Sequence, residues 1–252
     1  MANRLFVTGD CHGDVDWHKL AMPAFPEQKN LDREDVVVIM GDAGICWDGG
    51  KFDAYCQKWH EEKNYTTLAV AGNHENYDVI SRLPIVEKWG GKVYQVTPHV
   101  FYTVTGEVYN ICGYNCVAIN GADSHDKDRR KEGRDWWAAE QIKSEDILKA
   151  MQNVSELYYR GADLDFVFSH TAGAANTRLI NPSFTPTESD RLLDYLLYGA
   201  EFKMHYFGHM HVDKRVLDRS HCLYIPVYEI IDGKECMQHG VNYKKEENNR
   251  GN

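Results

Sequence analysis

The segment Gly72-Asn73-His74-Glu75 follows a short apolar run at residues 67–71, and this arrangement recurs four times in the chain. The other polar clusters follow runs at residues 5–8, 36–40, 166–168 and 203–207; they are Asp10-Cys11-His12, Gly41-Asp42, Ser169-His170 and Gly208-His209-Met210-His211. All five runs are short and rich in β-branched or aromatic residues, which is typical of buried strands. Because α/β proteins bind ligands where the carboxyl ends of strands meet, the clusters predict one shared site.

The clustered side chains are metal ligands by chemical type. Aspartate offers an anionic oxygen, histidine an imidazole nitrogen and asparagine a carbonyl oxygen, a mixture that favours Mn, Fe, Zn or Ni over Ca or Mg. In an extended segment, residues two apart point the same way, so Asp10 and His12 could share one ion. His209 and His211 have the same spacing, although two neighbouring ions could take one histidine each.

Each cluster alone has an ordinary explanation. Gly-Asp after a strand is commonly a turn, Gly-Asn-His can begin a helix, and His-x-His can lie on a polar strand edge. The occurrence of all five clusters, each after a predicted strand, favours a metal site over these alternatives.

The order of the clusters, from residue 9 to residue 211, resembles that of the calcineurin-like metallophosphoesterases. This resemblance implies a four-layer α/β/β/α sandwich of two mixed sheets flanked by helices. It also implies hydrolysis of a phosphodiester or small phosphomonoester by a hydroxide that bridges two divalent ions, with Mn favoured. His74 would be the catalytic residue that stabilises the transition state and protonates the leaving oxygen. The implied ligands are Asp10, His12 and His211 for one ion, Asn73, His170 and His209 for the other, and Asp42 for both.

Two departures distinguish the chain from protein serine/threonine phosphatases and dinucleoside tetraphosphatases. Those enzymes carry an arginine in the second motif and another after Gly-Asn-His-Glu, whereas this chain has Cys46-Trp47 and Asn76. Because arginine binds phosphate oxygens in a bidentate manner, both losses disfavour these activities. The non-catalytic scaffold that binds a protein partner is also disfavoured, because His74 and all seven ligand positions are present.

The polar segment 121–137 resembles an insert of poorly characterised bacterial and phage members of the superfamily. It contains Asp-Lys-x-x-Arg followed by Trp136-Trp137, and we predict that Arg130 contacts the substrate. The alternative is a solvated charge run in which the two tryptophans begin a helix. Glu75 likewise has two interpretations: it orients His74, or it is a carboxylate at a helix start.

Composition limits the remaining choices. The 252 residues predict a single domain at 1–243 and a polar, disordered tail at 244–252. A net charge of −10 disfavours nucleic acid, and so a nuclease, unless a basic groove lies near residues 127–134. Seven scattered cysteines and no membrane-spanning run predict reduced thiols and a cytoplasmic location. The partner that the family resemblance implies is a small phosphorylated substrate. The pair Cys112 and Cys116 favours a strand or hairpin over a zinc site, and the oligomeric state stays open.

The pattern also predicts the other elements. Helices are expected at 16–22, 52–62, 80–89, 136–159 with an interruption near Ser144, and 188–197. Strands at 93–96, 100–105, 107–111 and 116–120 should form an antiparallel stretch of the second sheet, and 215–231 should supply closing hairpin strands.

Overall fold

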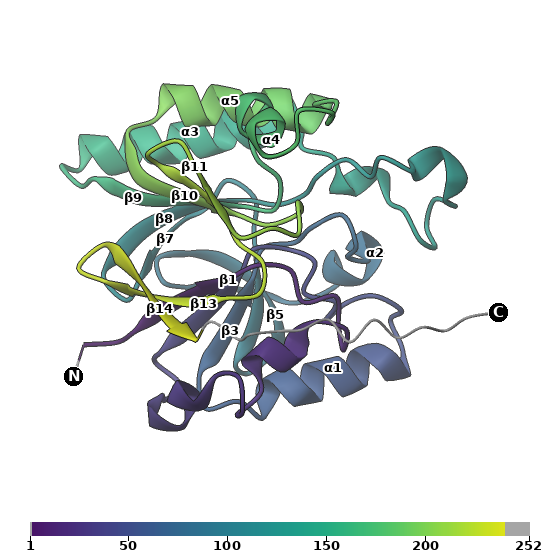
Figure 1. Cartoon of the computed structure of the whole chain (residues 1–252), viewed down its shortest axis with the longest axis vertical. Helices are drawn as coiled ribbons and strands as arrows, with labels where there is room; N and C mark the ends of the chain where they lie inside the picture. Colours follow the sequence, from purple (N-terminus) through teal and green to yellow (C-terminus); the bar gives the residue numbers. More distant parts are fainter. Residues whose placement is uncertain (1, 240–252) are drawn as a thin grey trace.

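The computed structural model describes residues 2–239, which form two mixed β-sheets packed face to face with helices on both outer sides (Figure 1). The first sheet has the order β14-β13-β1-β2-β3-β6-β5-β4, and the second has the order β11-β12-β10-β9-β8-β7. This arrangement confirms the predicted four-layer sandwich.

The strands of the first sheet are β1 (Leu5–Thr8), β2 (Val36–Ile39), β3 (Thr66–Ala69), β4 (Ile85–Lys88), β5 (Gly91–Thr97), β6 (Val100–Thr103), β13 (Val227–Ile231) and β14 (Lys234–His239). Those of the second sheet are β7 (Val108–Ile111), β8 (Tyr114–Ile119), β9 (Leu164–Ser169), β10 (Phe202–Phe207), β11 (Lys214–Val216) and β12 (Ser220–Cys222). The α-helices are α1 (Lys51–Glu61), α2 (Tyr77–Ile80), α3 (Ser144–Tyr159), α4 (Ala174–Ile180) and α5 (Glu188–Gly199). Four short 3-10 helices are η1 (Trp17–Leu20), η2 (Pro26–Asn30), η3 (Lys127–Arg129) and η4 (Ala138–Glu140).

Parallel strands form the centre of each sheet. β1, β2, β3 and β6 pair in parallel in the first sheet, and β8, β9, β10 and β12 do so in the second. The loops that leave these strands therefore gather at one edge of each sheet.

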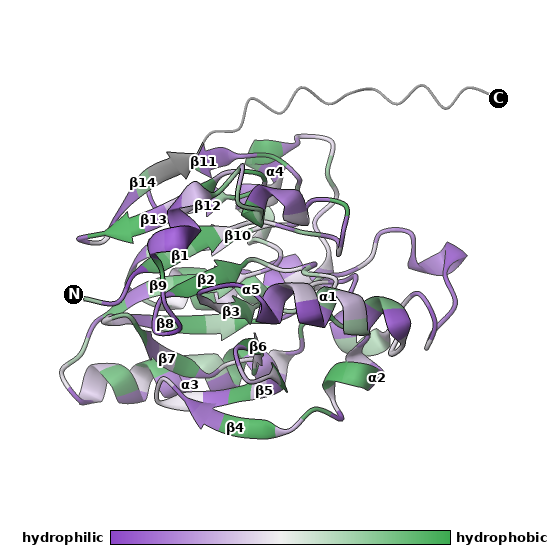
Figure 2. Cartoon of the chain, turned by 90° about the horizontal axis from the view of Figure 1, so that it is seen from below, coloured by the Kyte–Doolittle hydropathy of each residue, from purple (hydrophilic) through white to green (hydrophobic). Residues whose placement is uncertain are grey.

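Alternating side chains build three apolar layers. Leu5 and Val7 face the core between the sheets, which also contains Phe166 from the second sheet, while Phe6 packs on the outer side toward α1. Val117 of the second sheet points outward to the layer formed with α3 and α5. Because both faces of β1, β2 and β9 are buried, apolar residues predominate in these strands, and green segments are seen among the strands in Figure 2.

The predicted helix at 80–89 is wrong. Helix α2 ends at Ile80, and residues 85–88 form edge strand β4, which pairs antiparallel with β5. Pro84 has no N–H to donate and disfavours a helical conformation at Leu83, so it separates the two elements. The exposed Ile85 and Glu87 alternate with half-buried Val86 and Lys88, which is strand periodicity.

The antiparallel middle of the chain is divided between the sheets, not confined to the second. β5 and β6 belong to the first sheet, and β7 and β8 to the second. The chain crosses at Gly106, where φ is +78° and the N–H bonds to the carbonyl of Ala118. The closing segment is divided in the same way: β11 and β12 form a hairpin in the second sheet, whereas β13 pairs with β1.

Other predictions agree with the structure in part. Helices α1 and α5 lie where expected, residues 17–20 form a 3-10 helix, and the predicted helix at 136–159 is regular only from Ser144. The domain boundary at 243 and the tail at 244–252 lie outside the described residues. Within residues 2–239, no helix combines the length and apolar character needed to span a bilayer.

Candidate metal centre

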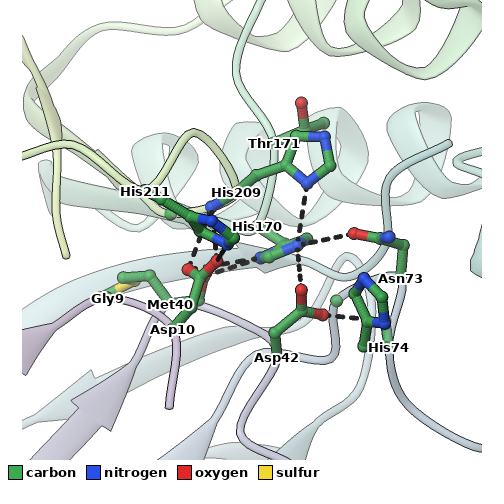
Figure 3. Close-up of polar contacts among 12 residues, drawn as sticks. Gly9, Asp10, Met40, Asp42, Asn73, His74, His170, Thr171, His209 and His211 are labelled. Carbon is green, nitrogen blue, oxygen red and sulfur yellow. Dashed lines mark hydrogen bonds and ion pairs between the residues drawn. The ribbon is translucent and has the colours of Figure 1, made fainter. Parts of the chain in front are cut away.

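The loops after five parallel strands bring all seven predicted ligands together. Asp10, Asp42, Asn73 and His170 are buried, while His12 and His209 are partly exposed and His211 is exposed. Figure 3 shows the carboxylates of Asp10 and Asp42 pointing toward the imidazole of His170. The site therefore lies at the seam between the two sheets, at their shared carboxyl edge.

One group of ligand atoms surrounds the Asp10 carboxylate. Its Oδ2 lies 3.1 Å from Nε2 of His211 and 3.9 Å from Nε2 of His12. The three ligand atoms lie within 4.8 Å of one another, close enough to hold one ion. This is the set predicted for the first ion.

A second group surrounds Nε2 of His170. Nδ1 of this ring lies 3.0 Å from the carbonyl oxygen of Met40, which fixes Nδ1 as the donor and turns Nε2 toward the site. Asn73 Oδ1, His209 Nδ1 and Asp42 Oδ2 lie 3.0, 3.2 and 3.3 Å from Nε2. A proton on Nε2 can satisfy one of these atoms at a time. A divalent cation can satisfy them all, so the donor set fits a metal ion.

Asp42 faces both groups. Its Oδ2 lies 3.6 Å from Nε2 of His12 and 3.3 Å from Nε2 of His170, while Oδ1 accepts the backbone N–H of His74 at 2.8 Å. Asp10 also reaches toward His170, with 4.0 Å between Oδ1 and Nδ1. The placement of Asp42 is the one expected of a shared ligand.

Charge is balanced within this cluster. Burial opposes protonation of His12, but hydrogen bonds to Asp16 and Asp42 raise its pKa to about 10. Burial likewise opposes the negative charge of Asp42, yet His170 and His12 hold the pKa of that carboxyl well below its usual value. Burial and the neighbouring His170 lower the pKa of His209 to about 3.

Four of the seven residues have left-handed backbone. The φ angles are +46° at His12 and Asp42, +65° at His209 and +49° at His211. Non-glycine residues adopt this region rarely, and such conformations concentrate at functional sites. The expected extended geometry is therefore wrong at 10–12 and 209–211. Because the chain turns at these histidines, His209 lies beside His170 while His211 lies beside Asp10.

Motif glycines make room for the ligands. A Cβ atom at Gly72 would collide with Oδ1 of Asp42, and one at Gly208 would collide with Oδ1 of Asp10. These positions need glycine because a neighbouring carboxylate occupies the space of any side chain.

His74 lies beside the ligand cluster with its ring half-buried. Burial lowers the pKa of His74; the charge of Asp42 opposes this shift, and that of Arg130 adds to it. Its ring, with His12 and Asp42, lines a cavity of about 240 Å³. These contacts place His74 next to the two groups of ligand atoms, and His74 belongs to neither group.

The segment 121–137 leaves the carboxyl end of β8 and projects from the side of the sandwich, seen in teal in Figure 1. Arg130 in this segment bonds to Asp126 Oδ1 at 2.7 Å and to the Asp135 carbonyl oxygen at 3.3 Å. Trp137 is the extended N-cap of the short 3-10 helix η4 and donates to Asp78, and Trp136 donates to Glu140, so the tryptophans precede a single 3-10 turn and not the α-helix, which begins at Ser144.

Several supporting residues were absent from the sequence prediction. Asp16 accepts from His12 Nδ1 at 2.9 Å, and the four-residue spacing could have indicated it. Ser124 Oγ accepts from Asn73 Nδ2 at 3.2 Å, which turns the Asn73 carbonyl oxygen to His170. The buried Lys19 donates to the carbonyls of Gly9, Asp10 and Tyr224 at 2.7 to 2.8 Å, a role without a sequence signal.

Glu75 has neither of its predicted roles. Its carboxylate is buried and accepts the N–H groups of Gly72 at 2.6 Å and Gly44 at 3.2 Å. The N-cap of α2 is instead Asn76. Glu75 thus ties the loop after β3 to the loop after β2.

His125 also lies near the ligands: its ring centre is 6.3 Å from that of His209.

The family comparison agrees with this geometry. The model for calcineurin-like phosphoesterases matches residues 4–213. Among solved structures, TT1561 of Thermus thermophilus shares 12% identity with a TM-score of 0.52, covering 95% of this chain and 99% of that chain. A candidate 5′-nucleotidase from Staphylococcus aureus, in complex with alpha-ketoglutarate, shares 16% identity with a TM-score of 0.49, covering 94% of this chain and 52% of that chain.

The comparison with curated proteins found no match. TT1561 shares the fold, and at 12% identity the likeness goes no further. The family model covers most of the chain, including every predicted ligand. The chain belongs to the calcineurin-like phosphoesterase family and is a hydrolase of phosphoester bonds.

Proposed function

We propose that this protein is a dinuclear phosphoesterase that hydrolyses a phosphodiester or a small phosphomonoester, with Mn as the favoured metal. The observation that carries the proposal is the set of acceptor atoms around Nε2 of His170, at 3.0 to 3.3 Å from Asn73, His209 and Asp42. Asp10, His12 and His211 would hold the first ion, and Asn73, His170 and His209 the second. Asp42 would contact both.

Bound divalent ions would lower the pKa of a water molecule and polarise the phosphoryl oxygens. The chain itself supplies the positions: Asp42 fixes the spacing of the two groups, and Asp16 orients His12. His74 lies on the cavity side of the cluster, where it can donate a proton to the departing oxygen.

The substrate class follows from what the site lacks. Neither Cys46 nor Asn76 can replace a guanidinium, so two bidentate contacts to a phosphomonoester dianion are missing. This favours a diester or a small phosphorylated molecule over a phosphoprotein. The seven free cysteines and the acidic charge support a cytoplasmic enzyme that does not bind nucleic acid.

Metal content and turnover together test the proposal. Purified protein loaded with Mn or Zn should carry close to two ions per chain, as measured by elemental analysis. It should hydrolyse aryl phosphate or bis-aryl phosphate, and a chelator should abolish that turnover. A maximum of one ion per chain would exclude the shared role of Asp42. Two bound ions without turnover on any phosphoester would instead favour the non-catalytic scaffold.

A further inference from the structure

The cavity beside the metal centre has two unlike walls. Asp42, His12 and His74 line it from the ligand cluster, whereas Trp47, Phe52 and Val15 supply the apolar part of its lining. Its volume is about 240 Å³. Roughly 150 Å³ of apolar cavity is enough to hold a benzene molecule, so one aromatic ring and its link to a phosphoryl group can enter.

The apolar wall is held in place by the fold. The ring of Trp47 lies 6.0 Å from that of His74 at an interplanar angle of 34°, and Trp137 lies edge-on to it at 6.3 Å. The backbone of Trp47 donates to Asp53 Oδ1 at 2.7 Å and accepts from Asn76 Nδ2 at 3.0 Å. A subsite fixed before binding loses little conformational entropy when a ligand enters.

Phe52 is fixed from the other side. It lies on the first turn of α1, and a Cβ atom at Gly13 would lie 2.8 Å from its Cζ. The glycine in the first motif therefore lets the Phe52 ring approach the loop that carries His12. Sequence alone gives no sign of this contact, because Gly13 and Phe52 are far apart in the chain.

Charge restricts what this cavity can bind. Among residues 2–239, no lysine or arginine lines it, and the exposed Asp14 lies at its wall. A phosphate or carboxylate on the part of the leaving group that lies away from the metal ligands would meet Asp14, with no lysine or arginine in the lining to balance it. Stacking on tryptophan, in contrast, favours a flat uncharged ring.

We propose that this cavity is the leaving-group subsite, and that it selects phosphoesters whose leaving alcohol carries an uncharged aromatic or heteroaromatic ring. The inference rests on the proposed function. In the reaction, water forms a new P–O bond, the P–O bond to the alcohol breaks, and the alcohol oxygen gains a proton. Trp47 takes no part in these bond changes and acts as a specificity-determining residue through contact with the ring.

Matched esters test this assignment. Benzyl and ethyl esters of phosphate have similarly basic leaving alkoxides, so a difference between them reports contact with the ring. The Mn-loaded wild type should have a higher kcat/KM for the benzyl ester. Trp47→Ala should lower that value by roughly five- to a hundredfold, the usual size of a lost stacking contact, while the ethyl ester changes little. Trp47→Phe should retain most of the preference.

Trp89→Ala is the matched control, because Trp89 is also half-buried but lies in the turn between β4 and β5. Phe52→Leu provides a second variant of the same wall if Trp47→Ala does not fold. Calorimetric binding of benzylphosphonate and ethylphosphonate, which cannot be hydrolysed at their C–P bond, measures the subsite without chemistry. The benzyl compound should bind more tightly, and only the Trp47 and Phe52 variants should reduce the difference.

Equal kcat/KM values for both esters in the wild type would overturn the assignment. Equal losses on both esters in Trp47→Ala, together with loss of bound metal, would also overturn it by making Trp47 a support of the ligand cluster. If no ester is hydrolysed, the proposed function fails. The phosphonate measurement then still decides the subsite, because it supports an aromatic subsite or excludes one independently of turnover.

Discussion

The two sheets contribute different chemistry to the same centre. The first sheet supplies both carboxylates, Asp10 and Asp42, whereas the second supplies three imidazoles, His170, His209 and His211. Each predicted ion takes ligands from both sheets, so neither sheet holds a complete set. The centre exists only when the apolar core between the sheets has brought their carboxyl edges together.

The carboxylates also differ in how they join the sheets. Asp10 crosses the seam by accepting the N–H of His209 at 3.0 and 3.1 Å. Asp42 accepts the N–H of His74, within its own sheet, and turns its other oxygen to the second. Buried charges are costly unless they are paired, so both depend on partners from the opposite sheet.

The largest effect should come from Asp42→Asn. The amide keeps an oxygen for the N–H of His74 but removes the negative charge shared by both groups. Turnover should fall by roughly a thousandfold or more, and at least one ion per chain should be lost. Elemental analysis and steady-state kinetics measure the two outcomes.

Asp163→Asn is the control for this change. Asp163 is exposed and precedes β9, so it lies at the opposite edge of the sheet from the metal centre. The Asp163→Asn variant makes the same change in charge as Asp42→Asn and should leave turnover and metal content unaltered. Wild-type turnover and metal content in Asp42→Asn would show that Asp42 does not bridge the ions.

His74→Ala should separate catalysis from metal binding within the first sheet. Turnover should fall by roughly a hundredfold to ten-thousandfold, the usual size of general acid–base catalysis, while metal content stays almost intact. The loss should be smaller for a nitrophenyl ester than for an alkyl ester, because nitrophenolate needs little protonation as it leaves.

The leaving groups are the internal control for this variant. Equal losses on both esters would mean that His74 positions the phosphoryl group and does not act as the acid. A large loss of metal would make His74 a ligand and remove the distinction between it and the other residues of the cluster.

The sequence predicted the convergence of the ligands because it rests on strands with clear apolar runs. Asp42 and His170 follow buried strands in parallel sheets, so their approach needs only the fold. The local backbone geometry of the ligand loops could not be predicted from the sequence. The left-handed turns at His12 and His209 have no signal in the apolar pattern. They replace the extended geometry from which the sharing of one ion by Asp10 and His12 was predicted, although these two residues do lie in one group of ligand atoms.

Contacts between residues far apart in the chain also could not be predicted from the sequence. Lys19 bonds to a carbonyl 205 residues away, and Ser124 bonds to Asn73 across 51 residues. Neither Lys19 nor Ser124 belongs to one of the five motifs. The sequence did mark the segment 121–137, but its charges allowed both a substrate contact and a solvated surface, and the structure leaves Arg130 paired within its own segment.

The smallest expected effect concerns Arg130, the contact that the second sheet would add through the loop after β8. Its pair with Asp126 is weak, because Asp126 is 53% exposed and such pairs contribute little. If a substrate phosphate replaces Asp126, Arg130→Ala should raise KM roughly three- to tenfold with little change in kcat. Asp126→Asn should have the opposite effect and lower KM, because it frees the Arg130 guanidinium.

Arg134→Ala is the control for these variants, since Arg134 is 74% exposed and pairs with Asp135. Changes of the same sign in Arg130→Ala and Asp126→Asn, or no change in either, would show that this segment is a solvated charge run and that the metal centre positions the phosphate without it.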